Sequence, residues 1–410
     1  MIDKSQTTPG TRVVDFTEKT AVARFQAAVS LHAHTRWSNE VLTGVPAYLD
    51  RIPLVARLTR KEVRAYLDRN GRPIDFAKAW WHPAVEAPSV WNSEIGQIRS
   101  RLGLTPLVSI TDHDCLKACV EIQCLHEAQM VPLSFEWTVP FHEGYFHLGV
   151  HNLRPESVPT VLPMLLGYTQ APVPEQLSAL LAALNDDPQV LLVLNHPLWD
   201  LAGVGARRHI VLLRCFLGLH GRSLHALELN GYRLRQENRA VGPLAQAHGL
   251  PLISGGDRHG AAPNSLLNLT DATTFAEFVR EIRERRQSVI LVMPEYRRPL
   301  VTRKLEVLGD TIRTYPSNPH GRRWWADRIT YEEDGVVHAL SEEWTDGGPA
   351  WVRLTVRAFQ AGTSARLLPF FRALVWLGRA ASSDRAKHAS FTEAAFAASQ
   401  PDPPYSEDVS

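Results

Sequence analysis

Histidines and carboxylates recur at the ends of short apolar runs along this chain. Residues 29–35, VSLHAHT, place His32 and His34 two positions apart, so both imidazoles point to the same side of an extended strand. Such a pair can bind one metal ion, although a lone pair often contacts only backbone carbonyls or water. Later runs carry His113, Glu136, His147, His196, Asp257 and His259. Because buried imidazoles and carboxylates are costly without a compensating cation, this recurrence predicts a shared metal site.

Seven β-like runs carry or precede these side chains. They cover residues 25–35, 106–114, 131–138, 145–152, 189–197, 223–230 and 250–257. Near-continuous apolar runs with helix-sized segments between them predict parallel strands covered by helices, and seven such strands favour closure into a barrel. The carboxyl ends of barrel strands share one rim, where the candidate ligands would converge. An eighth run, residues 288–293, is expected to close or flank the sheet.

Two regions fall outside this pattern, so we expect a barrel unit over residues 1–300 with two additions. Residues 41–100 are longer than a strand-to-helix connection needs and are expected to form an inserted lid or cap. Residues 301–410 are expected to form a C-terminal extension. It contains a helix-like run at 363–380, whose apolar stripe is expected to dock on the barrel, and a tail expected to be disordered from about residue 400.

The overall charge and composition disfavour several classes of function. Lys and Arg (44) nearly balance Asp and Glu (43), so no global field attracts nucleic acid or an anionic membrane. The chain has neither an apolar N-terminal leader nor an apolar run of roughly 18 residues, so we expect a soluble, cytoplasmic protein without membrane contact. The four cysteines fit neither a disulfide framework nor CxxC zinc pairs, and we expect reduced thiols.

The order of the motifs resembles that of one known family. H-x-H-T at 32–35, T-D-H-D at 111–114, Glu136, His147, N-H-P at 195–197 and G-D-x-H at 256–259 are similar to the motifs of the polymerase and histidinol phosphatase (PHP) family of metal-dependent phosphoesterases. The resemblance covers roughly residues 24–295. It implies an α/β fold, a distorted (β/α)7 TIM-like barrel with an insertion after the first strand, in agreement with the seven runs.

The resemblance also implies two to three divalent metal ions and a ligand set for each. The first ion would take His32, His34, Glu136 and Asp257, the second would share Glu136 and add His147 and His196, and the third would take His113, His259 and a residue after the first motif. The family's usual aspartate at that last position is Asn39 here, which makes Glu40 the candidate ligand and weakens the expectation of a third ion. Zinc, manganese or iron suits such ligands better than calcium.

The implied reaction is hydrolysis of a phosphate ester, foremost a small phosphomonoester, by a hydroxide that bridges two metal ions. Glu136, Asp257 and His259 are the candidate catalytic residues. Candidate cations for the substrate are Arg36, Arg233, Arg235 and Arg258, the last of which could equally be structural because it alternates with two predicted ligands. Trp81 is one of several tryptophans that could stack on a base or a sugar, although tryptophan is more often a core residue.

Three alternative functions remain open on the sequence. Amidohydrolases also begin with His-x-His in a barrel, but many bridge their metals with a carboxylated lysine, and this chain has no lysine between Lys117 and Lys304. A nuclease or nucleotide phosphatase acting on a nucleic-acid end fits the aromatic insert, whereas the balanced charge disfavours a long nucleic-acid groove. A non-catalytic metal-binding module is the third alternative, kept open by Asn39.

Overall fold

The structure is a computed structural model with a mixed α/β fold. It describes residues 10–363 except 44, 46–48, 50–52, 126, 127, 129, 317, 319 and 320. The helix-like run at 363–380 beyond its first residue, and the tail from residue 400, lie outside the described residues. Within the described part of the chain, no helix is both long enough and apolar enough to cross a bilayer.

One five-stranded sheet contains the first two predicted runs and the eighth. Its order is β1-β12-β11-β2-β5, with bounds Thr11–Asp15, Ser288–Val292, Leu266–Thr270, Ala27–Ser30 and Thr105–Val108. Strand β2 pairs in parallel with β5 and antiparallel with β11. The eighth run, as β12, therefore flanks this sheet between β11 and β1. The sequence reasoning did not predict β1 and β11.

The other five predicted runs form the second sheet. Its order is β10-β9-β8-β7-β6, with bounds Leu252–Gly255, Ala226–Asn230, Leu191–Leu194, Gly144–Leu153 and Leu133–Phe141. Strands β8, β9 and β10 are parallel, but β7 is antiparallel to both of its neighbours, so the prediction of an all-parallel arrangement is wrong at this strand. Only residues 142 and 143 separate β6 from β7, and so short a connection permits a hairpin but no parallel crossover.

Among the described residues the ladders of these two sheets do not close into a barrel, but two isolated bridges link the two sheets. Ala33, just after β2, bridges to Arg258, just after β10, and His113 bridges to Glu136 of β6. Two candidate metal ligands thus lie at the junction itself. The strands β2, β8, β9, β10 and β11 are buried along their whole length, which is typical of strands that are covered on both faces.

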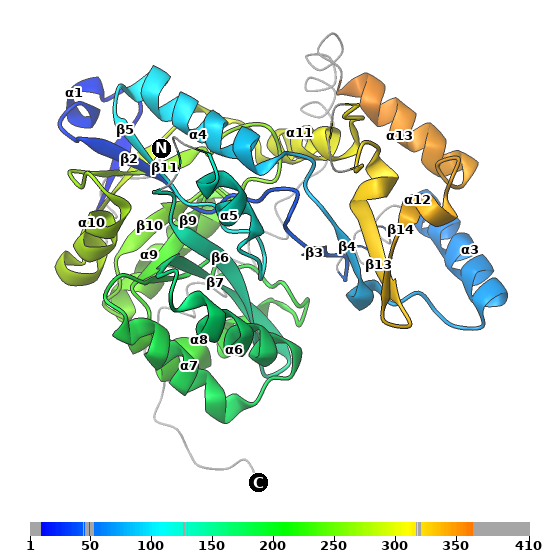
Figure 1. The fold of residues 1–410 in the computed structure, drawn as a ribbon, viewed down its shortest axis with the longest axis horizontal. Helices are drawn as coiled ribbons and strands as arrows, with labels where there is room; N and C mark the ends of the chain where they lie inside the picture. The colour runs from blue at the N-terminus through cyan, green and yellow to red at the C-terminus, as the bar shows by residue number, and fades with distance from the viewer. Residues whose placement is uncertain are drawn as a thin grey trace.

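Helices cover these sheets (Figure 1). Their bounds are α1 Lys19–Val22, α4 Ala87–Leu102, α5 Lys117–Gln123, α6 Val158–Gln170, α7 Pro174–Asp186, α8 Ala206–His220, α9 Arg235–Ala247 and α10 Phe275–Arg280. Helix α7 shows how the sequence specifies them: Pro174 occupies its first turn, and Leu177, Leu181 and Leu184 share the buried face. Helix α4 begins within the predicted insertion of residues 41–100 but packs against β5 of the first sheet, so this part of the insertion does not form a lid.

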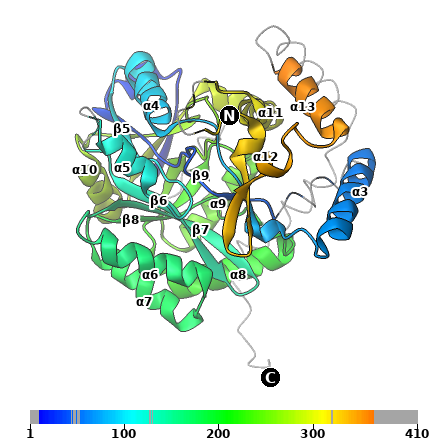
Figure 2. The same cartoon turned by 45° about the vertical axis from the view of Figure 1, so that its right-hand side comes forward.

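A smaller, four-stranded sheet joins the two additions. Its order is β14-β13-β4-β3, with bounds Val336–Ala339, Ile329–Glu333, Ala79–Trp81 and Glu40–Val41. Strand β4 pairs with β13, which is more than two hundred residues later. Around this sheet lie α3 Pro53–Asn70, α11 Leu300–Ile312, α12 Leu340–Glu343 and α13 Ala350–Gly362, as Figures 1 and 2 show. Strand pairing therefore joins residues 79–81 of the insertion to residues 329–331 of the C-terminal extension.

His225, beside β8, makes the free energy of unfolding fall at low pH, and this effect does not depend on metal. Its Nδ1 accepts a hydrogen bond from Leu192 N at 2.8 Å, and its Nε2 lies 2.8 Å from Asn185 Oδ1. Burial, together with the guanidinium groups of Arg283 and Arg286, lowers the pKa of His225 to about 3. The unfolded chain takes up this proton near pH 6.5, so the contribution of His225 to stability is complete above that pH and falls as the pH drops toward 3.

We therefore expect the His225→Asn variant to lose less stability than the wild-type chain when the pH is lowered. Between pH 7.5 and pH 5.0 the wild-type chain should lose about 2 kcal/mol through this group, at 1.36 kcal/mol per pH unit, and the variant should be spared that loss. Urea unfolding of metal-free protein at the two pH values measures the difference. An identical acid loss in both proteins would contradict the assignment.

Candidate metal centre

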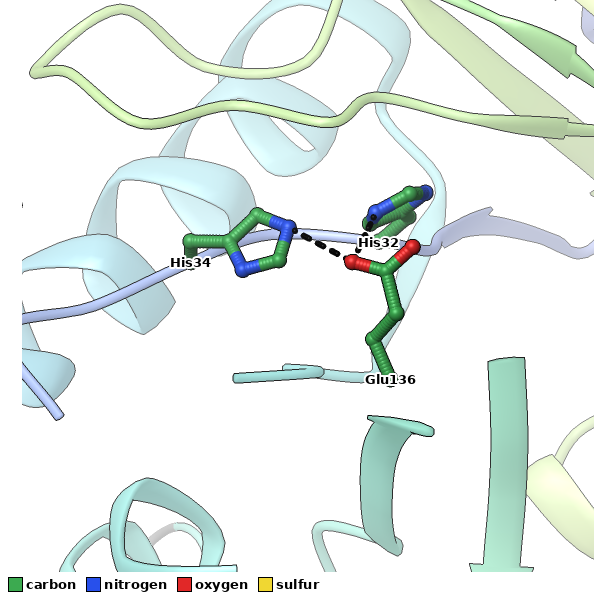
Figure 3. A group of neighbouring side chains, drawn as sticks. All are labelled: His32, His34 and Glu136. Atoms are coloured by element: carbon green, nitrogen blue, oxygen red, sulfur yellow. Dashed lines mark hydrogen bonds and ion pairs between the residues drawn. The ribbon is translucent and has the colours of Figure 1, made fainter. Parts of the chain in front are cut away.

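Glu136 on β6 is the centre of a buried group of histidines. Its Oε2 lies 3.1 Å from His32 Nε2, 3.3 Å from His34 Nε2 and 3.4 Å from His113 Nδ1. Its Oε1 lies 3.3 Å from His147 Nδ1 and 3.2 Å from His196 Nε2. Figure 3 shows His32 and His34, from the stretch after β2, both directed at this carboxylate. The two oxygens of Glu136 therefore face different imidazoles.

Asp257 and Glu40 extend the group on either side of His34. Asp257 Oδ1 lies 3.6 Å from His34 Nε2, 3.7 Å from His32 Nε2 and 3.5 Å from His259 Nδ1. Glu40 Oε2 lies 3.2 Å from His113 Nε2, and its Oε1 lies 3.2 Å from His259 Nε2. The structure thus brings all nine predicted ligands together, and we call them the metal cluster: His32, His34, Glu40, His113, Glu136, His147, His196, Asp257 and His259.

The antiparallel direction of β7 explains why His147 belongs to the cluster and His151 does not. His147 lies near the start of β7, at the edge where the neighbouring parallel strands end, whereas His151 lies four residues further from that edge. His151 Nδ1 is instead 2.8 Å from Ser109 Oγ. Burial lowers the pKa of His151 to about 3, so this imidazole is neutral behind the cluster.

The donor set fits divalent metal ions. His34 Nε2, His113 Nδ1 and His147 Nδ1 are buried and form no hydrogen bond within the described residues, and each faces the cluster. Groups of three ligand atoms in the cluster lie within 4.8 Å of one another. Imidazole and carboxylate donors without thiolate suit zinc, manganese or iron. The cluster can therefore hold divalent metal, and its chemistry does not distinguish among these three ions.

The electrostatics of the cluster also favour a cation. Burial favours neutral carboxylates, but His32, His113 and His147 outweigh it and hold the pKa of Glu136 well below its usual range. Burial and the neighbouring His259 lower the pKa of His34 to about 4, and burial lowers that of His147 to about 4. Glu136 is thus charged while His34 and His147 are neutral, which is the protonation state in which these groups bind metal. Against the effect of burial, Glu136 raises the pKa of His32 and Glu40 raises that of His113, so a bound metal ion would have to displace a proton from each of these imidazoles.

Three members of the cluster have backbone conformations that side chains other than glycine rarely adopt. The φ angles are 62° at His32, 28° at His196 and 53° at Asp257. Such conformations cost about 1–3 kcal/mol each and persist where the surrounding structure enforces them, as at active sites. Gly255 shows how tight these surroundings are, because a Cβ there would lie 1.7 Å from Glu228 Oε1 and 2.9 Å from the Cβ of His32.

The sequence reasoning missed residues that orient the ligands. Glu228 Oε1 lies 2.6 Å from His32 Nδ1, and its Oε2 accepts a hydrogen bond from the backbone N–H of His196 at 2.8 Å. Asn195 Nδ2 donates to Glu136 Oε1 at 2.9 Å, and Asn230 Nδ2 donates to Asp257 Oδ2 at 3.2 Å. The available signal was a lone carboxylate within the apolar run ALELN, since a buried acid on a strand requires a partner.

The four predicted substrate-binding arginines have different positions. Arg36 forms ion pairs with Glu86 at 2.6 Å and Glu121 at 3.2 Å, and Arg258 is bonded to Glu94 at 2.5 Å. Their guanidinium groups therefore bond to acids outside the cluster. The Arg258 guanidinium also donates to Gly260 O at 2.8 Å and to Ala261 O at 3.0 Å, so it faces away from the cluster that Asp257 and His259 join.

Arg233 lies two residues before α9, and Arg235 is the first residue of that helix. Arg233 forms an ion pair with Glu237 at 2.6 Å, and its guanidinium lies 4.3 Å above the ring of Trp199, which itself packs 5.0 Å from the ring of His196. Arg235 lies farther along, 5.7 Å from the ring of Tyr296. Trp81 of β4 is 5.7 Å from the ring of His259, so the small sheet also borders the cluster.

Lys304 on α11 is a further cation that the sequence reasoning did not select. Its side chain is exposed to solvent. Desolvation and the neighbouring Arg233 lower the pKa of Lys304, whereas Asp257 raises it. Lys304 is therefore within electrostatic reach of both the cluster and Arg233.

Known proteins resemble this chain only weakly, in sequence and in structure. No protein-family model and no curated protein sequence matches the chain. Solved structures that resemble it include a candidate metal-dependent phosphoesterase from Bifidobacterium adolescentis, 15% identical over 63% of this chain and 95% of that chain, with a TM-score of 0.34. Another is an amidohydrolase from Chromobacterium violaceum with bound sulfate and no metal, 14% identical over 69% of this chain and 96% of that chain, with a TM-score of 0.33. Likenesses this weak carry no argument about function.

Proposed function

We propose that the chain is a metal-dependent phosphoesterase of the PHP type that hydrolyses a small phosphomonoester. The observation that carries the proposal is the position of Glu136, whose Oε2 faces His32 and His34 while its Oε1 faces His147 and His196. A carboxylate with its oxygens turned toward two sets of imidazoles suits a bridge between two cations about 3.5–4 Å apart.

We further propose that the two five-stranded sheets form the arcs of a distorted (β/α)7 barrel within residues 1–300. The bridges Ala33–Arg258 and His113–Glu136 support this, because they connect β2 to β10 and β5 to β6 and so order the seven predicted strands in a ring. Under this proposal the candidate ligands lie on the rim of the barrel, and residues 41–81 together with the C-terminal extension form a cap beside it.

Residues around the cluster would hold the ligands in place for this reaction. A pair of divalent cations, when bound, supplies a nucleophilic hydroxide near neutral pH and neutralises the phosphoryl oxygens. Glu228 fixes the ring of His32 through Nδ1 and leaves its Nε2 facing Glu136. Asp112 accepts hydrogen bonds from Thr35 N at 2.5 Å and Thr35 Oγ1 at 2.7 Å, which fixes the turn after His34. Glu40, His113 and His259 would hold a third ion.

Arg233 and Lys304 are the cations best placed to bind the phosphate of a substrate. Arg233 packs on Trp199 beside His196, and Lys304 is within electrostatic reach of Asp257. The aromatic rings of Trp81 and Trp199 border the same cluster and would contact the organic part of the ester. A compact substrate with one phosphate suits this set of two cations better than a polymer, which needs a basic groove.

Removal of the Arg233 guanidinium should weaken substrate binding more than removal of the Arg235 guanidinium does. For Arg233→Met we expect KM to rise by about tenfold or more, because a charge-assisted contact to phosphate is lost, with a smaller change in kcat. Arg235→Met is the matched control, since that side chain lies over Tyr296, and its KM should change less than about threefold. Equal effects of the two substitutions would remove Arg233 from the proposed substrate site.

A phosphoester panel on protein of known metal content tests the proposed function. Chain reconstituted with zinc, manganese or iron(II) should hydrolyse p-nitrophenyl phosphate and small phosphomonoesters, and treatment with a chelator should abolish turnover. Faster hydrolysis of a 3′,5′-bisphosphonucleoside or of short RNA would establish the nucleotide or nucleic-acid alternative. Turnover of amides or lactones alone would establish the amidohydrolase alternative. Two or more bound ions without hydrolysis of any ester or amide would identify a non-catalytic metal-binding protein.

A further inference from the structure

A cavity of about 570 Å³ lies beside the small sheet, between residues of the insertion and of the C-terminal extension. Its walls come from α3, β13, α12, α13 and the residues around β4, which Figure 2 shows on the side of the molecule away from α6 and α7. No member of the metal cluster lines it. The volume is within the range of about 300–1,000 Å³ typical of small-molecule sites.

The surface of the cavity is mainly apolar and unusually aromatic. Its aromatic lining consists of Tyr66, Phe76, Trp325, Tyr331, Trp344 and Trp351. Electron-rich faces of tryptophan and tyrosine attract organic cations, most strongly when water is excluded. An aromatic cavity of this size therefore favours a ligand with a flat apolar body, and it can also stabilise a positive charge on that body.

Carboxylates outnumber cations on the same walls, and each cation is already paired. Arg69 lies 3.6 Å from Glu343, and Lys78 lies 3.0 Å from Glu332. Arg72 is paired with both Glu333 and Asp334. The lining carries no further arginine or lysine. The cavity is thus unsuited to an anionic ligand.

Glu62 and Asp75 are the lining carboxylates that none of these cations pairs with, and Asp75 is exposed and already accepts a hydrogen bond from Ala77 N at 2.9 Å. Glu62 lies on α3 in the same row as Thr59 and Tyr66, three residues after the first and four before the second, so all three face the cavity. Among the described residues Glu62 has no ion-pair or hydrogen-bond partner. A half-buried acid next to aromatic rings is the counterion that an organic cation requires.

Two buried polar atoms in the lining also have no hydrogen-bond partner among the described residues. Trp351 Nε1 and Thr59 Oγ1 are inaccessible to solvent and form no hydrogen bond within the described part of the chain. Buried donors without partners are rare because each costs free energy. The indole N–H can only donate, so a ligand that satisfies it must bear an acceptor such as an ether or carbonyl oxygen.

We propose that this cavity is a second binding site, for an aromatic organic cation that bears an oxygen acceptor. The positive charge pairs with Glu62, the flat body lies among the tryptophans, and the acceptor receives the Trp351 N–H. The site lies apart from the metal cluster and does not depend on phosphoesterase activity. Binding can therefore be measured on metal-free protein, and its outcome is independent of the proposed function.

The test uses berberine, a flat cationic compound with ether oxygens whose fluorescence rises in an apolar environment, titrated into full-length protein in the presence of a chelator. We expect saturable binding of one dye per chain. Glu62→Gln should weaken berberine binding by about tenfold while leaving the uncharged probe N-phenyl-1-naphthylamine nearly unaffected. Glu175→Gln, at an exposed carboxylate on α7 remote from the cavity, should bind both probes as the wild-type chain does.

A second pair of variants tests whether the dye occupies this cavity. Val352→Trp should block binding because Val352 lines the cavity, whereas Leu354→Trp, on the same helix at a residue that is 70% exposed, should not. Equal binding by the two variants would overturn the proposal, as would no saturable binding to the wild-type chain. Tighter binding to full-length Phe371→Asp would also overturn it, because it would show that the chain's own segment after α13 is the occupant.

Discussion

Glu136→Gln should remove bound metal and abolish hydrolysis. The substitution keeps the shape of the side chain but eliminates the negative charge that faces five imidazoles, and an amide cannot bridge two cations. Loss of an outer partner of a metal ligand alone lowers metal affinity by 10–100-fold, so loss of this carboxylate should lower it by more than about 100-fold. Elemental analysis and hydrolysis of p-nitrophenyl phosphate measure both effects.

Glu143→Gln provides the matched control for this experiment. Glu143 lies in the connection between β6 and β7 of the same hairpin, and its exposed carboxylate forms an ion pair with Arg208. Metal content and turnover should stay at the wild-type level in this variant. Retention of two ions per chain by Glu136→Gln would show that the carboxylate is not a bridge and would refute the central assignment.

Asp257→Ala and Glu40→Ala should have different effects on the number of bound ions. The first should remove the two ions proposed to share Glu136, called the principal pair, and the second should remove only the third ion. Asp257 Oδ1 faces His32 and His34 as well as His259, so its loss should remove metal from the principal pair and reduce turnover by more than about 100-fold. Glu40 faces His113 and His259, so Glu40→Ala should leave at least two ions bound. We expect His32→Ala to behave like Asp257→Ala.

The number of metal ions bound per chain, measured on the same preparations of the three variants, shows which residues hold the principal pair and which hold the third ion. Circular dichroism and the unfolding midpoint should be recorded in parallel, because a misfolded variant also loses metal. Full metal content in a folded His32→Ala or Asp257→Ala protein would reject the assignment of the first ion. Loss of all metal from Glu40→Ala would show that the supposed third site is instead required for the other two.

The position of the candidate ligands was predictable because it follows from a local rule. A polar residue at the end of a buried strand must reach solvent, a partner or a cation, so His32, His196 and Asp257 could be selected from their short contexts alone. Strand ends that lie at one edge then bring such residues together. The rule holds even at β7, where the direction of the strand was predicted wrongly, because His147 lies near the opposite end of that strand.

The remaining features depend on contacts between distant segments, which no local pattern encodes. Strand β11 was not recognised because it follows β10 without a helix, and its antiparallel pairing with β2 is set only in three dimensions. Glu228 acts through His32, and its role becomes visible only when β9 lies beside the stretch after β2. The arginines show the same dependence on distant contacts. Arg233 and Arg258 have the same side chain, but only the folded chain shows that Arg233 packs on Trp199 and Arg258 binds Glu94.

The pairing of β3 with β4, and of β4 with β13, has a consequence for how the protein is made. Glu40 belongs to β3, which pairs with Trp81 of β4, and Trp81 in turn pairs with Ile329. His82, directly after β4, lies 3.0 Å from Thr330 Oγ1 and 2.9 Å from Ser38 O, next to Glu40. During translation, the ribosome has synthesised every other candidate ligand well before it adds residues 329–333. A nascent chain that stops short of them therefore carries Glu40 on a β3–β4 pair that lacks its third strand, β13.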